Sequence, residues 1–258
     1  PHAAESIQGQ AEADARKVDY AALLDADSLR GQRIGVMRFL LANYSEPTQA
    51  EFARALQALE AAGAELVEIT ESPDLRSISQ NAFQVLMFEL KADLNTYLAS
   101  TDPQQVKTRT LADLIAFNSA TPAETVLFGQ ELFEQAQATR GLDDPAYIEA
   151  RATSLRLAGP EGIDAMMADH DVVALIAPTT SRAWTNDPDD DDRSQGSSST
   201  LAAVAGYPHL TVPMGFDRGM PVGLSFIGGK WDDARILSLG YGYEQRTNER
   251  RAPTLARD

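Results

Sequence analysis

The sequence contains no cysteine, which excludes disulfide bonds, thiolate metal sites and a cysteine nucleophile. Positive charge is also scarce, because 22 Lys and Arg residues stand against 38 Asp and Glu residues, and the formal net charge is -16 at pH 7. Binding of phosphate backbones or anionic lipid headgroups requires clustered cations. The charge balance therefore argues against nucleic acids and anionic membranes as partners.

Long apolar runs are missing as well. No stretch approaches the roughly 18 apolar residues of a membrane-spanning helix, and the start, PHAAESIQGQAEADARK, has neither the basic nor the apolar region of a secretory signal. We therefore expect a soluble protein, in the cytoplasm or the periplasm, with no sign that separates the two. At 43% apolar residues, 258 residues can bury one large core or two small ones.

What the chain does contain is an alternation of strand and helix patterns. Strands are predicted at residues 33–39 and 65–69, on either side of a helix that begins at Pro47 and ends before Gly63. Apolar residues recur in that helix at helical spacing: Phe52, Leu56 and Leu59. A strand, a helix and a strand of this combined length are typical of a parallel crossover unit.

Further helices follow along the chain. They are predicted at residues 78–98, 111–117, 123–139, 146–158, 161–170, 201–205 and 231–246. We expect Thr110 to cap the second of these and Thr121, followed by Pro122, to cap the third. Gly159 and Pro160 are expected to break the helix at 146–158. The helix at 78–98 carries an apolar stripe: Phe83, Leu86, Met87, Leu90, Leu94, Tyr97 and Leu98.

The last part of the chain holds three short apolar runs, at residues 172–176, 209–212 and 222–227. Their length and their β-branched or aromatic residues predict buried strands, and Pro and Gly mark the corners between them. Loops that end the strands of an α/β sheet are where ligands usually bind. Because helices and strands interleave throughout and no internal repeat is present, we predict one α/β domain.

Two patterns that suggest ligand sites do not meet the requirements. The acidic run Asp187–Asp192 lacks the Gly and Glu positions of a calcium-binding EF-hand loop, so we predict an exposed loop and no metal site. Gly215, Gly219 and Gly223 do not form the GxGxxG pattern before a helix that nucleotide binding requires.

The serine cluster at Ser197, Ser198 and Ser199 contains the obvious candidate nucleophile. A serine needs a base within hydrogen-bond reach and an oxyanion hole, and His209 or a lysine could supply the base. The simpler interpretation is that Ser199 or Thr200 caps the helix at 201–205. The best-placed lysines, at positions 91, 107 and 230, are expected to be solvated surface residues, unlike a buried neutral base.

A series of short motifs in one order resembles the C-terminal portion of amidase-signature hydrolases, and most of all the bacterial peptide amidases. The motifs are LADLIAFN (111–118), LFGQEL (127–132), GLDDPAYIEAR (141–151), RLAGPEGIDA (156–165), IAPT (176–179), AGYP (205–208), VPMG (212–215), PVG (221–223) and YEQ (243–245). The resemblance runs from about residue 18 to residue 251.

The resemblance implies hydrolysis of a carboxamide C–N bond without a cofactor, by a serine, a second serine in a cis peptide bond and a lysine. Both serines belong to a Gly/Ser-rich segment that precedes the matched region, and no such run precedes residue 20. We therefore assign no catalytic residue to this chain. We expect a mixed, largely buried sheet covered by helices, with an N-terminal arm (1–19), an amidase-like C-terminal part (20–251) and a tail (252–258).

By the same resemblance, five residues are expected to border the substrate: Thr179, Thr180, Trp184, Phe128 and Gln130. The expected partners are the N-terminal catalytic segment, or a second chain that carries it, and a small amide or peptide-amide substrate. Without that segment the chain is expected to be inactive and to expose strand edges and apolar surface.

Two other functions stay open. One is a non-catalytic module that uses the amidase fold to bind a ligand or a partner. The other is catalysis by Ser199 with a lysine and His209.

Overall fold

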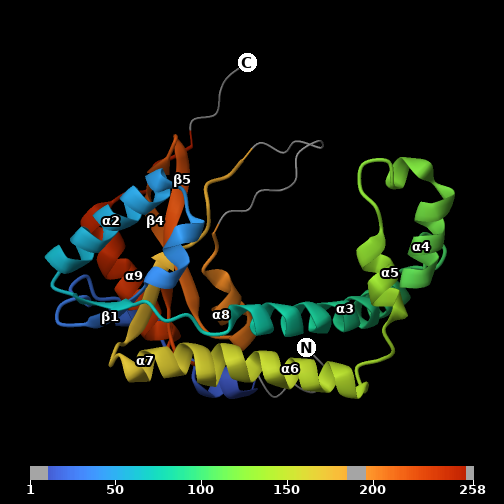
Figure 1. Cartoon of the computed structure of the whole chain (residues 1–258), viewed down its shortest axis with the longest axis horizontal. Coiled ribbons are helices and arrows are strands. Elements are labelled where there is room, and N and C mark those ends of the chain that lie inside the picture. The colour runs from blue at the N-terminus through green and yellow to red at the C-terminus, as the bar shows by residue number, and fades with distance from the viewer. Residues whose placement is uncertain (1–10, 185–195, 254–258) are drawn as a thin grey trace. The chain divides into compact units, whose positions relative to one another are not determined.

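The computed structural model of the chain describes residues 11–184 and 196–253. Figure 1 shows helices and strands that alternate along the chain. Two compact units emerge, a division that the sequence pattern had not indicated. Among the described residues, the first unit contains those up to Ser72, those from Gly159 to Trp184 and those from Gly196 onward, and the second unit runs from Pro73 to Ala158. The predicted boundaries of an arm, a body and a tail stay a prediction.

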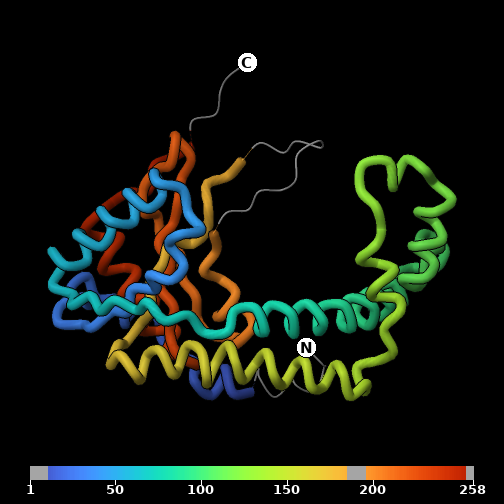
Figure 2. Tube along the Cα trace, in the orientation of Figure 1, coloured from blue at the N-terminus to red at the C-terminus, as the bar shows by residue number. Residues whose placement is uncertain are grey.

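The first unit is built on a sheet with the strand order β2-β1-β3-β5-β4 within the described residues. The strands are β1 (Arg33–Met37), β2 (Glu65–Ile69), β3 (Ala174–Pro178), β4 (His209–Asp217) and β5 (Met220–Ile227). β1 pairs in parallel with β2 and β3, whereas β5 runs antiparallel to β3 and β4. Figure 2 shows how strands from the start of the chain (blue) and from its end (orange to red) share this sheet. The prediction of a mixed α/β fold is confirmed.

The predicted parallel crossover is confirmed, although its first strand, predicted at 33–39, ends at Met37 and passes into a 3-10 helix, Arg38–Asn43. α2 (Glu46–Ala61) connects β1 to β2, and the Ser45 hydroxyl caps its start by accepting a hydrogen bond from the Thr48 amide at 3.3 Å. Gly63 follows the helix with φ of +91°, a left-handed conformation that glycine adopts without steric cost. The two strands and the helix therefore follow from local signals in the sequence.

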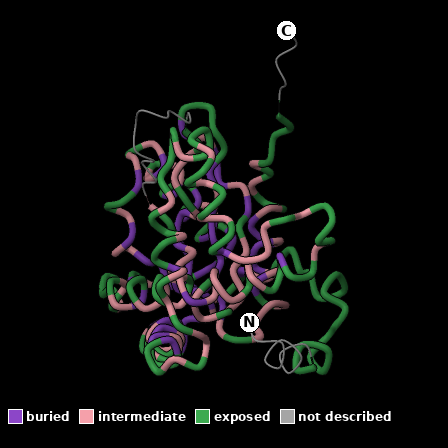
Figure 3. The backbone as a smooth tube through the Cα atoms, turned by 90° about the vertical axis from the view of Figure 1, so that its right-hand side faces the viewer, coloured by how far each residue is buried: buried purple, intermediate pink, exposed green. Residues whose placement is uncertain are grey.

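One face of the sheet carries the apolar core. Residues that alternate along the strands, among them Ile34, Ile176 and Phe226, pack with Phe52 of α2 and Tyr243 of α9 (Asp233–Thr247). Figure 3 shows buried positions in purple, and every residue of β3 is buried. Each fully buried Leu or Phe side chain contributes about 1.5–3 kcal/mol relative to exposure. The opposite face is also apolar at Met37, Leu175 and Ile227, but it carries the polar residues Ser225, Thr211 and His209 as well. These polar residues lead to the candidate site.

The second unit is helical, with α3 (Leu75–Ser100), α4 (Leu111–Ala120), α5 (Glu131–Ala138) and α6 (Pro145–Ala158). α3 and α6 lie side by side (Figure 1), and the rings of Phe88 and Tyr147 meet across them with centroids 5.7 Å apart. The Tyr147 hydroxyl also donates to Glu89 Oε1 at 2.8 Å. Few apolar residues of this unit are buried, and many large ones are exposed.

Two predictions about helices are wrong. The helix predicted at 123–139 is a short 3-10 turn, Pro122–Glu124, followed by non-helical residues up to α5. Thr121 makes no side-chain cap, Gly129 disfavours a helix interior by about 1 kcal/mol, and the apolar residues 126–128 are exposed, so burial does not hold them in a helix.

The predicted break at Gly159 and Pro160 is wrong as well. The chain passes from α6 straight into a π-helical segment, Gly159–Asp164, and then into α7 (Ala165–Asp169). A proline lacks the backbone N–H that an α-helix uses and its ring crowds the preceding turn. The wider π-helical turn accommodates the proline, so the chain continues as a helix.

Candidate functional site

The candidate site lies where β3 ends in the first unit. The backbone amide of Thr179 donates to the Gly223 carbonyl at 2.8 Å, and its carbonyl accepts from the Ser198 amide at 3.0 Å. These bonds hold Thr179 between β5 and the start of α8 (Ser199–Ala205). Its side chain then points into a group of hydroxyls that come from separate parts of the chain.

Four hydroxyl residues and one histidine form a connected network, which we call the hydroxyl cluster: Thr179, Ser198, Thr211, Ser225 and His209. Ser225 Oγ donates to Thr179 Oγ1 at 2.8 Å, and Thr179 Oγ1 lies 2.6 Å from Thr211 Oγ1. His209 Nε2 lies 2.6 Å from Ser225 Oγ, and Ser198 Oγ donates to Ser225 Oγ at 3.2 Å. Ser225 is fully buried whereas Thr211 is exposed, so the network leads from the interior to the surface.

Strand register explains why these residues meet. Thr211 of β4 is directly opposite Ser225 of β5, and the next strand, β3, places Ala177 on the other side of Ser225. Gly223 lies beside them. A Cβ at this position would collide with Thr211 Oγ1 and would lie 2.9 Å from Thr179 Oγ1. The missing side chain at this glycine is what allows the two threonine hydroxyls to approach each other.

Burial also sets the protonation of His209. It lowers the pKa of the imidazole below its ordinary value, since removal from water disfavours the charged form. The ring is therefore neutral at neutral pH, and one of its nitrogens donates while the other accepts.

The side chain of Tyr44 contacts both ends of the loop that follows β3. Its hydroxyl donates to the Pro178 carbonyl at 2.7 Å, and burial raises the pKa of this phenol well above its usual range. Gly196, with φ of +78°, passes so close to the ring that a Cβ would lie 2.6 Å from it. The Thr180 hydroxyl donates to the Gly196 carbonyl at 3.3 Å, and Trp184 is 45% exposed. Thr179, Thr180 and Trp184 thus follow one another on a loop whose start is held in place.

The other two predicted residues belong to the second unit. Phe128 is 70% exposed and, contrary to the prediction, is not part of a helix. Gln130 stands immediately before α5, where its Nε2 donates to Ser119 Oγ at 3.0 Å. Its buried Oε1 accepts no hydrogen bond from the described residues. The five predicted residues therefore fall into two groups, one in each unit.

The serine cluster does not form the catalytic arrangement that we had left open. His209 pairs with the buried Ser225, while Ser199 Oγ lies 2.9 Å from Ser197 Oγ. Neither Ser199 nor Thr200 caps α8, because Ser199 is its first residue and the N-cap position belongs to Ser198, whose side chain makes no capping bond. Thr211 and Ser225 were missed because isolated hydroxyl residues on strands carry no signal of their own.

The described contacts of Lys91, Lys107 and Lys230 do not suit a catalytic base. Lys91 is not the solvated surface residue we predicted: its Nζ donates to the carbonyls of Gln137 and Thr139 at 2.8 and 2.6 Å, where it caps the end of α5. Lys107 donates to the Pro103 carbonyl at 3.0 Å, and Lys230 lies over the ring of Trp231. Across residues 11–184 and 196–253, no group of three or more His, Cys, Asp or Glu side chains could hold a metal ion. None of the helices in these ranges combines the length and hydropathy needed to cross a bilayer.

Comparison with known proteins gives a consistent result. A family model described as Amidase matches residues 3–237. A probable amidase of Arabidopsis thaliana is 25% identical over 241 residues, which are 91% of this chain and 42% of that protein. A glutamyl-tRNA(Gln) amidotransferase subunit of Halorhodospira halophila is 32% identical over 242 residues, which are 89% of this chain and 48% of that protein.

Solved structures agree in fold. The native peptide amidase of Stenotrophomonas maltophilia is 46% identical with a TM-score of 0.82, and the match covers 92% of this chain and 47% of that one. A peptide amidase bound to the competitive inhibitor chymostatin is 45% identical with a TM-score of 0.84, covering 92% and 48%. An amidase family protein of Bacillus anthracis is 26% identical with a TM-score of 0.74, covering 92% and 43%. The chain spans about half the length of the relatives it matches.

Proposed function

The chain belongs to the Amidase family, and from this we propose that it forms the C-terminal part of an amide hydrolase that acts on peptide amides. The observation that carries this proposal is the 45–46% identity to peptide amidase structures over 92% of the chain. Cleavage of a carboxamide C–N bond needs a nucleophile, a base and donors for the developing oxyanion. We assign these groups to a segment outside the present 258 residues.

Two features support that assignment. The chain covers only 47–48% of the peptide amidase chains, which leaves room for such a segment in a longer protein. In addition, no described lysine makes a hydrogen bond to a serine of the hydroxyl cluster, and Ser225, the serine paired with His209, is fully buried. This chain then contributes binding and orientation, and the reacting groups come from the other segment.

The loop after β3 is the proposed wall of the substrate pocket. Trp184 offers a half-exposed aromatic surface for a substrate side chain, and Thr180 offers a hydroxyl nearby in the sequence. Sites of this kind combine apolar and aromatic walls with a few polar groups that fix orientation. Phe128 and Gln130 belong to the second unit, and we propose a role in substrate binding for them on the basis of the peptide-amidase resemblance alone.

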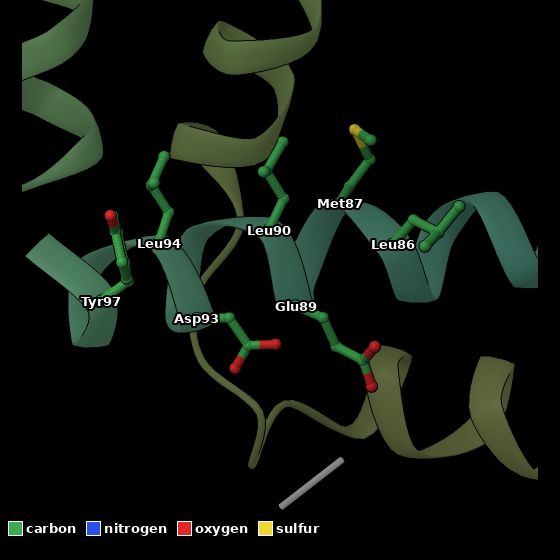
Figure 4. Close-up of a pocket in the computed structure, with 7 residues that line it drawn as sticks. All are labelled: Leu86, Met87, Glu89, Leu90, Asp93, Leu94 and Tyr97. Atoms are coloured by element: carbon green, nitrogen blue, oxygen red, sulfur yellow. The ribbon is translucent and has the colours of Figure 1, made fainter.

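The apolar stripe on α3 is the proposed contact surface for the catalytic segment. α3 buries Ile78, Phe88 and Leu98. Apart from Leu98, no residue of the stripe predicted from the sequence is buried: Leu86 is 58% exposed and Tyr97 is 64% exposed. Figure 4 shows Met87, Leu90 and Leu94, which line a groove along α3 together with these residues. A second apolar stripe on one helix indicates a second partner, because exposed patches of this kind mark interaction sites.

The enzymatic proposal is tested with the complete polypeptide that contains this chain. We expect it to release ammonia from N-acetylated amino-acid and dipeptide amides, whereas the 258-residue chain releases none. Ammonia release by the purified 258-residue chain that is lost in Ser199→Ala would overturn the assignment of the catalytic groups to another segment. Tight binding of peptide amides by the complete polypeptide, without turnover, would favour a binding module instead.

The contact surface is tested separately. The 258-residue chain alone should bind a hydrophobic dye, and Leu86→Ser should weaken both dye binding and association with the catalytic segment supplied in trans. Thr96→Ala is the matched control, because Thr96 is exposed on the same helix and does not line the groove. Equal effects of the two substitutions would show that the apolar stripe is not the contact surface.

A further inference from the structure

The proton count in the hydroxyl cluster fixes the direction of its hydrogen bonds. Ser225 Oγ donates its single proton to Thr179 Oγ1 at 2.8 Å. It therefore has no proton left for His209 Nε2, which lies 2.6 Å away, so the imidazole must be the donor in that contact. His209 is consequently the tautomer that carries its proton on Nε2, and Ser225 accepts from His209 while it donates to Thr179. The single proton of Ser198 Oγ is within reach of both Ser225 Oγ, at 3.2 Å, and the Thr179 carbonyl, at 3.3 Å.

The same count leaves one proton over at the end of the network. Thr179 Oγ1 accepts from Ser225, and the 2.6 Å contact between Thr179 Oγ1 and Thr211 Oγ1 uses one hydroxyl proton, whichever threonine donates it. The two threonines own two protons, so the other is not used within the cluster. Thr211 is exposed and Thr179 is half-buried, which places this unused donor where a ligand can reach it.

The opposite tautomer of His209 would reverse the direction of the hydrogen bonds in the cluster. If His209 carried its proton on Nδ1, Nε2 would accept from Ser225, Ser225 would accept from Thr179, and Thr179 would accept from Thr211. All three hydroxyl protons would then point inward, and the threonine pair could only accept hydrogen bonds. The identity of one buried imidazole proton thus decides whether the surface end of the network offers a donor or an acceptor.

We propose that the Thr179–Thr211 pair donates a hydrogen bond to the internal carbonyl oxygen of an N-acylated amide substrate, and that His209, acting through Ser225, is the positioning residue that keeps this proton facing outward. This inference rests on the proposed function. The oxygen is that of an internal carbonyl, because the carbonyl that is cleaved must be held by donors beside the nucleophile, which we place outside this chain. A neutral donor pair suits a neutral carbonyl acceptor.

The direction of the network is tested without any assay of hydrolysis. Nitrogen-15 NMR of the imidazoles in the complete protein, with the His209 signal assigned by its loss in His209→Gln, should show a neutral ring protonated on Nε2. Only two other histidines, His2 and His170, occur in this chain. A neutral ring protonated on Nδ1 would overturn the proposal, even if the protein hydrolyses amides.

The contact with substrate is tested by comparing two amides. N-acetylphenylalanine amide has the internal carbonyl, whereas 3-phenylpropanamide keeps the cleaved amide and the ring but lacks it. Thr211→Val in the complete protein should raise KM for the first about fivefold, the effect of one neutral hydrogen bond, with kcat little changed, because the bond is made equally in the ground and transition states. KM for the second should not change. Equal effects on both amides, or no effect on either, would overturn the proposal.

Matched variants separate positioning from structure. Thr211→Ser, which keeps the hydroxyl, should restore most of the affinity, and Thr96→Val, which removes a threonine hydroxyl bonded to the Ala92 carbonyl of α3, should leave KM unchanged. His209→Gln, which retains a donor near the Nε2 position, should raise KM less than His209→Met. Equal KM values for these two variants would remove His209 from the positioning role. A wild-type protein that hydrolyses neither amide would defeat the proposed function, while the NMR result would still decide the direction of the network.

Discussion

Asp217 ends β4 with a fully buried carboxylate that ties the sheet to the start of α2. Its Oδ2 accepts hydrogen bonds from Ser45 Oγ at 2.5 Å and Thr48 Oγ1 at 2.8 Å. Its Oδ1 accepts no hydrogen bond from the described residues and lies 3.8 Å from Arg182 Nε. Ser45 is also the residue that caps α2. The carboxylate therefore joins a strand end, a helix start and the loop that follows β3.

The cost of removing this carboxylate follows from these contacts. Hydrogen bonds to a charged group contribute about 1.5–3 kcal/mol each. Asp217→Ala leaves two hydroxyls without their acceptor and the Arg182 guanidinium without its counter-charge, so we expect a loss of about 3–5 kcal/mol, as for other broken buried pairs. Asp217→Asn keeps an oxygen acceptor but no charge, and because neutral hydrogen bonds are about half as strong, a loss of about 1–2 kcal/mol is expected.

The effect must also depend on pH. Burial alone would raise the pKa of the Asp217 carboxyl, but the hydroxyls of Ser45 and Thr48, with Arg182 and Arg218, outweigh it and lower the pKa. A carboxyl whose pKa is lower in the folded state stabilises the fold above its unfolded value of about 3.9 and loses this contribution as the pH falls through the folded pKa. The difference between wild type and Asp217→Asn should therefore shrink below about pH 4.

Urea denaturation followed by tryptophan fluorescence measures the unfolding free energy of the first unit, which contains Asp217. Both tryptophans of the chain, Trp184 and Trp231, belong to this unit. Asp93→Asn, which removes an exposed carboxylate in the second unit, is the matched control and should leave the transition unchanged. If Asp217→Asn is as stable as wild type at pH 7, or if its deficit persists undiminished to pH 3, the reasoning from these hydrogen bonds is refuted.

Three further outcomes are expected. Gly35→Ala should destabilise the first unit by about 1–3 kcal/mol in the same fluorescence transition, because the new Cβ would lie 2.7 Å from Ile69 Cδ1 and 2.8 Å from Leu175 Cδ2; an unchanged midpoint would contradict this close packing. Lys91→Met should accelerate amide hydrogen exchange in α5, whose terminal carbonyls its ammonium group binds, while the tryptophan transition stays in place. Burial lowers the pKa of His209, so its contribution to the stability of the fold should be complete above the unfolded pKa of about 6.5 and should decline as the pH falls below it. The pH dependence of the unfolding free energy in this range should therefore be weaker in His209→Gln.

Local elements could be predicted because their signals lie close together in the sequence. The capping box of α4 is an example: the Thr110 hydroxyl accepts from the Asp113 amide at 3.2 Å, and the Asp113 carboxylate accepts from the Thr110 amide at 3.0 Å. The helix predicted at 123–139 failed for the opposite reason. Its apolar residues were interpreted as a buried face, yet Phe128 and its neighbours are exposed, so helix formation there lacks the burial that usually stabilises it.

The sequence by itself determined the family, the mixed α/β class and the parallel crossover, since motif order and hydrophobic period are properties of neighbouring residues. Only the tertiary structure decided the hydroxyl cluster. Thr179, Thr211 and Ser225 come from separate segments and meet through the antiparallel register of β3, β5 and β4, and Ser198 joins them through hydrogen bonds to the Thr179 carbonyl. Serines and threonines are common on strands, and nothing in their local sequence distinguishes a hydroxyl that joins a network from one that faces water. Which proton His209 carries is likewise set by the partners that the fold places around it.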